Sequence, residues 1–75
     1  MKLNELNKGD VAKVVSVSAT SSELRRRMLD MGITKGVIIK IKKIAPFGDP
    51  IDIELRGYEL CLRKDDLKNI EVIKL

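Results

Sequence analysis

Two short runs in the second half of the chain, IDIEL at 51–55 and YELCLR at 58–63, alternate between apolar and polar residues. Such alternation is typical of strands that bury one face of a sheet. Only Arg56-Gly57 separates the runs, which predicts a tight antiparallel hairpin. Because arginine disfavours a positive φ angle, we expect a type I turn over Leu55-Arg56 with Gly57 as a left-handed bulge, not a type I′ turn.

The apolar members of both runs should face the core. They are Ile51, Ile53 and Leu55 in the first run and Tyr58, Leu60 and Leu62 in the second. Cys61 then falls on the outward face. The preceding loop, residues 45–50, holds two prolines and a glycine, which suit an architectural turn between strands. We expect Phe47, at the tip of this loop, to fold back onto the core.

Three further segments, residues 11–19, 37–45 and 70–75, are rich in valine and isoleucine and are predicted as strands. In the second of them, one face carries Val37, Ile39 and Ile41, and the other carries Ile38, Lys40 and Lys42. The N-terminal segment should pack against the body through Leu3 and Leu6. Residues 64–69 are predicted as a turn or a single 3₁₀ turn.

The only long helical pattern is TSSELRRRMLDMG at residues 20–32. Thr20 and Glu23 have the spacing of a capping box. One stripe of the helix carries the apolar residues Leu24, Met28 and Met31. Gly32 follows the last of them, where a left-handed C-terminal cap favours glycine, and Ile33 can pack back onto the last turn.

These elements predict a single domain over residues 1–75, because the chain is too short for two. Five short strands, tight turns and one helix between the first two strands indicate a mainly β fold. The expected architecture is a small, strongly bent antiparallel β-barrel. A domain this small has little room for a deep pocket, so we expect it to work through its surface.

The composition argues against several classes of protein. The chain has no histidine and one cysteine, so imidazole catalysis, histidine-ligated metal sites and internal disulfides are excluded. A phosphate-binding loop needs glycine followed by lysine and then serine or threonine, but this chain has the order lysine-glycine, at Lys8-Gly9 and Lys35-Gly36. We therefore expect no enzyme, no cofactor and no metal site. No apolar run reaches the ~20 residues of a membrane span, so no membrane-spanning segment is expected. The lack of any possible internal disulfide suits a reducing, cytoplasmic environment.

The helix and the turn after it carry the candidate partner-binding residues. They are Arg25, Arg26, Arg27, Leu29 and Lys35. The net charge of +4 suits an acidic protein face, a nucleic acid or an anionic membrane surface. Leu29 lies off the apolar stripe, so it is available for a partner if it is exposed. One tyrosine and one phenylalanine make a poor stacking platform for single-stranded nucleic acid.

Two stretches, ELRRRMLDMGITKG and APFGDPIDIELRGYELCLRKDD, together resemble the ferrous iron transport protein A (FeoA) family. The positions that match its pattern are Leu24 to Arg27, Gly32, Gly36, Ala45, Pro46, Gly48, Asp49, Pro50, Arg56, Gly57, Tyr58, Leu60, Leu62 and Arg63. The chain departs from the pattern at Lys35, where the family often has proline, at Phe47, where leucine is common, and at Cys61, where alanine is common. The resemblance spans nearly the whole chain.

The resemblance implies an SH3-like β-barrel and a small cytosolic accessory of the ferrous iron permease FeoB, a membrane protein with a cytosolic GTP-binding domain. Such an accessory is expected to bind FeoB and to modulate uptake. Transition-metal binding is associated with the family, although no residue here is assigned to a metal. The oligomeric state stays open.

Two alternatives stay open. The basic charge favours a small nucleic-acid-binding barrel, and the resemblance adds a regulator-type barrel, because iron-dependent repressors carry the same fold. The shortage of aromatic residues argues against nucleic acid. Direct carriage of ferrous iron ranks last, since the chain has only scattered carboxylates and one thiol to offer.

Overall fold

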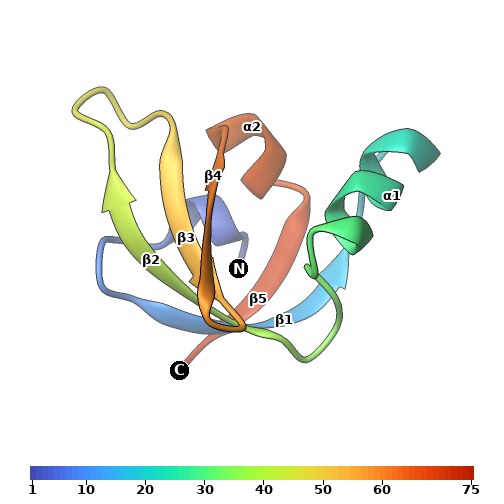
Figure 1. Cartoon of the computed structure of the whole chain (residues 1–75), viewed down its shortest axis with the longest axis horizontal. Helices are drawn as coiled ribbons and strands as arrows, with labels where there is room; N and C mark the ends of the chain where they lie inside the picture. Colours follow the sequence, from blue (N-terminus) through green and yellow to red (C-terminus); the bar gives the residue numbers. More distant parts are fainter.

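Five antiparallel strands form one bent sheet in the order β4-β3-β2-β1-β5 (Figure 1). The computed structural model describes residues 1–75. The strands are β1 Val11–Val17, β2 Ile38–Ile44, β3 Ile51–Leu55, β4 Tyr58–Leu62 and β5 Ile70–Lys74. β4 and β5 are the two edges and do not pair with each other, so the sheet bends around its core without closing. The predicted mainly β fold is confirmed.

Three helical segments connect or flank the strands. The 3₁₀ helix η1 spans Leu3–Glu5, α1 spans Ser22–Asp30 between β1 and β2, and α2 spans Lys64–Leu67 between β4 and β5. The main helix therefore lies where the sequence predicts it. The segment predicted as a turn or a 3₁₀ turn forms a single α-helical turn. None of these helices has the length and apolar character needed to cross a membrane.

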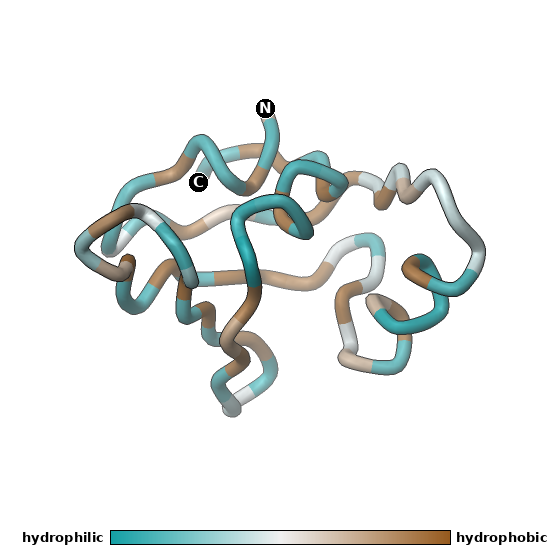
Figure 2. Tube along the Cα trace, turned by 90° about the horizontal axis from the view of Figure 1, so that it is seen from above, coloured by the Kyte–Doolittle hydropathy of each residue, from teal (hydrophilic) through white to brown (hydrophobic).

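The core forms from the inward faces of the strands, and the alternation that produces it is visible along the trace in Figure 2. The predicted inward residues of β2 and β3 are buried, as are Leu3 and Leu6. β4 departs from its prediction. Leu62 is buried, but Leu60 is only half-buried and Tyr58 is 41% exposed. An edge strand has a neighbour on one side only, which leaves these side chains partly uncovered.

The start of α1 differs from its prediction. Ser21, not Thr20, is the N-cap, because its hydroxyl accepts a hydrogen bond from the Leu24 N–H at 3.1 Å. The end of α1 is as predicted. Gly32 adopts a φ of +87°. The N–H groups of Gly32 and Ile33 donate to the carbonyls of Leu29 and Met28, both at 3.0 Å, which is the Schellman pattern.

The β3–β4 turn was predicted wrongly. Leu55 pairs directly with Tyr58, so Arg56 and Gly57 alone make the turn, with φ angles of +50° and +84°. Two positive φ angles are the signature of type I′, whose twist matches that of the flanking strands. That match outweighs the strain of a left-handed arginine. The Arg56 guanidinium also donates a hydrogen bond to the Thr34 hydroxyl at 3.2 Å.

Candidate partner-binding site

A surface groove of about 270 Å³ lies between α1 and the end of β1, which are neighbours in Figure 1. β1 contributes Val15 to Val17, α1 contributes Arg25 and Leu29, and the turn after α1 contributes Ile33 to Lys35. Four of the eight lining residues are aliphatic, two carry hydroxyl groups and two are cations. Such a groove can hold an apolar side chain and attract a carboxylate beside it.

Local geometry explains why these residues meet. Arg25 and Leu29 are four residues apart, so they share one face of α1. The Schellman turn at Gly32 then reverses the chain and places Lys35 on the same groove. Leu29 is 49% exposed, which meets the condition that made it a candidate. Three of the five predicted partner-binding residues are therefore brought together.

Arg26 and Arg27 lie elsewhere. Arg26 lines a separate hollow near the start of α1 with Ser22 and Glu23. Arg27 lines neither hollow. Consecutive helical residues point about 100° apart, which explains why the three arginines do not form one surface. All three side chains are exposed.

The arginines of α1 and Lys35 form no ion pair within the molecule, although α1 also carries Glu23 and Asp30. The ion pairs join Glu71 to the N-terminal ammonium and to Lys2, Asp65 to Lys68, and Asp10 to Lys74. No arginine of α1 has a carboxylate oxygen within 4.0 Å, and neither has Lys35. An acidic partner surface would therefore meet free cations here.

Phe47 is a second exposed apolar group, and its predicted position was wrong. Its side chain is 97% exposed at the tip of the β2–β3 loop. The Gly48 N–H donates to the Ala45 carbonyl at 2.7 Å and closes a tight turn. Pro46 and Phe47 are the two central residues of that turn, so their side chains point away from the strands. The sequence Pro46-Phe47-Gly48 is typical of a tight turn, and it could have predicted the exposed position of Phe47.

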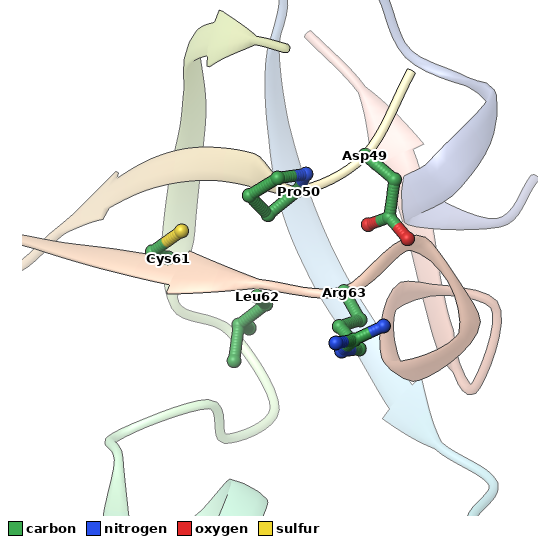
Figure 3. A pocket seen from close by; sticks show the side chains of 5 residues that line it. All are labelled: Asp49, Pro50, Cys61, Leu62 and Arg63. Carbon is green, nitrogen blue, oxygen red and sulfur yellow. The ribbon is translucent and has the colours of Figure 1, made fainter. Parts of the chain in front are cut away.

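The largest hollow of the molecule, about 380 Å³, adjoins the end of β4 and is lined by Asp49, Pro50, Cys61, Leu62 and Arg63 (Figure 3). The neighbouring Asp52 carboxylate, with partial desolvation and Asp49, raises the pKa of Cys61. The thiol is therefore held in its protonated, less nucleophilic form.

No three His, Cys, Asp or Glu side chains lie together in a group that could hold a metal ion.

Comparisons with known proteins give a consistent result. The family model described as the FeoA domain matches residues 1–74. A curated Fe(2+) transport protein A/Fe(2+) transporter FeoB fusion protein from Porphyromonas gingivalis is 38% identical over 72 residues. That match covers 96% of this chain and 8% of the fusion protein.

Two solved structures share the fold. The solution structure of a FeoA-like protein from Clostridium acetobutylicum has a TM-score of 0.91 and 44% identity, over 100% of this chain and 86% of that one. The crystal structure of Stenotrophomonas maltophilia FeoA with zinc, described as a prokaryotic SH3 domain protein, has a TM-score of 0.85 and 26% identity. It is matched over 97% of this chain and 89% of its own. The predicted SH3-like fold is confirmed.

Proposed function

The chain belongs to the FeoA family, and from this premise we propose that it is a cytosolic accessory of ferrous iron uptake that binds a FeoB-type permease and modulates transport. The fusion protein of Porphyromonas gingivalis supports the proposal, because it carries both parts in one polypeptide. Joining two domains raises their effective concentration, which favours domains that act together.

We assign the contact to the groove between α1 and β1. The observation that carries this assignment is that Leu29, Arg25 and Lys35 line one groove together with the aliphatic residues Val15, Val17 and Ile33. A half-exposed leucine can supply apolar contact area. The two cations, which have no internal partner, can pair with carboxylates and set the orientation. The expected partner surface is acidic with an apolar centre, on the cytosolic GTP-binding region of the permease.

Arg26 and Arg27 have a different expected role. They are exposed but lie outside the groove, so they would contribute to the long-range attraction of an acidic partner. Rim charges of this kind change association rates and salt dependence more than they change the lifetime of a complex.

The test is an amide NMR titration of the protein with the isolated GTP-binding domain of its cognate permease, in nucleotide-free, GDP-bound and GTP-analogue states. We expect shifts concentrated in residues 24–36. Leu29→Ser should weaken binding up to about tenfold, since binding can bury only the exposed half of this side chain and full burial of a leucine contributes on the order of 1.5–3 kcal/mol. Ile73→Ser, which changes an exposed residue of β5, is the matched control.

Three results would contradict the proposal. Shifts confined to another face would move the interface away from the groove. No shift in any nucleotide state would direct attention to the membrane-embedded part of the permease. Binding to a DNA duplex that weakens steeply with salt would favour the nucleic-acid alternative.

A further inference from the structure

The outer edge of β4 is a free strand edge with the geometry to accept another strand. β4 pairs only with β3, through five consecutive residue pairs from Leu55–Tyr58 to Ile51–Leu62. This pairing has no bulge, unlike those between β1 and β5 and between β2 and β3. Bulges, prolines and edge lysines are the usual protection of a free edge, and Tyr58–Leu62 contains none of them.

The hairpin register identifies the backbone groups that face outward. In an antiparallel pair, residues alternate between those bonded to the neighbouring strand and those that point away from it. Because Leu55 and Tyr58 close a two-residue turn, Tyr58, Leu60 and Leu62 bond to β3. Glu59 and Cys61 therefore present their N–H and C=O groups to the open side. None of the backbone hydrogen bonds of turns, loops and caps reaches either residue.

The charge beside this edge indicates what kind of strand fits. Glu59 lies directly across from Glu54 in the non-hydrogen-bonded register, where side chains of paired strands are closest. Neither carboxylate takes part in an ion pair within 4.0 Å. Like charges in such a pair are destabilising. Glu54 has Lys40 directly across from it on β2, whereas Glu59, on the edge strand, has no cation across from it, and an added strand could supply one.

The opposite face of the edge is apolar. Leu60 is half-buried and Tyr58 is 41% exposed, so both offer surface to an added strand. The hollow at the end of β4 has a mixed lining, because the charged residues Asp49 and Arg63 border it beside Pro50, Cys61 and Leu62 (Figure 3). An occupant with apolar side chains on this face and basic side chains on the Glu59 face would complement both.

We propose that the β4 edge binds an extended peptide segment of alternating apolar and basic residues by strand addition. Main-chain hydrogen bonds from Glu59 and Cys61 supply the binding, and alternate side chains supply the selectivity. A second copy of this chain fits less well, because pairing β4 with β4 would bring Glu59 of the other copy close to Glu59 of this one.

The probe is an eight-residue synthetic peptide of alternating lysine and valine, compared with its glutamate counterpart. Amide hydrogen exchange, read by NMR, is the measurement. In the free protein, the amides of Glu59 and Cys61 should exchange much faster than those of Leu60 and Leu62. The lysine peptide should slow exchange at Glu59 and Cys61, and the glutamate peptide should not.

Two variants test the two parts of the mechanism. Cys61→Pro removes the outward N–H without removing a bond to β3, and it should abolish peptide binding; Cys61→Ser keeps the N–H and is the control. Glu59→Lys should weaken the lysine peptide about 5–10-fold and let the glutamate peptide bind. If Cys61→Pro loses its dispersed NMR spectrum, the variant has not folded. The Glu59→Lys variant and the amide exchange pattern of the native chain then test the proposal.

Three outcomes would overturn the inference. The first is no protection of the Glu59 and Cys61 amides by the lysine peptide. The second is equal protection by both peptides, which would remove the role of Glu59. The third is protection of these amides in the free protein that grows with protein concentration, which would assign the edge to a second copy of the chain.

Discussion

The two edge strands of the sheet, β4 and β5, differ in whether another segment covers their outer side. At β5 the N-terminal segment supplies a cover, because the Val72 N–H donates to the Met1 carbonyl at 2.8 Å and Lys2 forms a bridge with Glu71. At β4 no segment pairs with the outer side. The covering segment at β5 is held in place by its own buried apolar residues, and the outer side of β4 has no such segment. Leu3 and Leu6 provide that anchor at β5.

The largest expected effect comes from loosening the covered edge. Leu3 is fully buried beside β5, so Leu3→Ala should lower the free energy of unfolding by about 2–5 kcal/mol. Leu60→Ala on the open edge should cost less, since Leu60 is only half-buried. Urea unfolding of both variants measures the difference. Equal costs would mean that the N-terminal cover contributes no more to stability than the open edge does.

The second effect concerns the turn that contacts β4. A Cβ at Gly32 would lie 2.8 Å from the Tyr58 hydroxyl, which donates a hydrogen bond to the Met31 carbonyl. Gly32→Ala should therefore cost about 1–3 kcal/mol for the left-handed backbone, and more for the clash. Gly36→Ala is the matched control, because Gly36 has a φ of +91° with no atom within 4 Å of such a Cβ. Thermal or urea unfolding of the pair isolates the Tyr58 contact, and equal losses would contradict it.

A smaller effect is expected at the β3–β4 turn, where a substitution should stabilise the open edge. Arg56 is left-handed with a φ of +50°, and asparagine tolerates this conformation better. Arg56→Asn should raise the free energy of unfolding by up to about 1 kcal/mol. The loss of the solvent-exposed hydrogen bond from Arg56 to Thr34 reduces this gain. Chemical denaturation measures the gain. A loss would show that the bond to Thr34 matters more than the backbone strain.

The smallest effect is a pH dependence at the covered edge. Hydrogen bonding to the N-terminal ammonium, and then to Lys2, lowers the pKa of Glu71 from its ordinary value of 4.5. A lowered pKa in the folded state means that the carboxylate stabilises the fold above pH 4.5 and loses this effect as the pH falls below it. The stability difference between the native chain and Glu71→Gln should therefore shrink as the pH falls below 4.5. A difference that stays constant would contradict this pairing.

Much of the fold could be predicted, because strand alternation and helical spacing are properties of neighbouring residues. The inward faces of β2 and β3 and the glycine cap of α1 are examples. The errors arose where two local solutions compete. Ser21 and Thr20 can both cap a helix, and the twist of the β3–β4 hairpin overrode the preference of arginine.

The candidate site was less accessible to prediction than the fold. Charge and exposure pointed to α1, but the sequence contains no measure of the distance between α1 and β1. The groove forms only because Val15 to Val17 come to lie beside Leu29. Phe47 was misplaced because apolar character alone does not tell whether a turn points a side chain inward or outward.

The pairing of β1 with β5 has a consequence for how the chain is made. It joins Ala12 to Lys74 and Val17 to Ile70, so the sheet is complete only after nearly the whole sequence has left the ribosome. The hairpin of β3 and β4 can form earlier from neighbouring residues. During synthesis the nascent chain therefore passes through a stage in which β1 has no β5 beside it, and the sheet should be completed late.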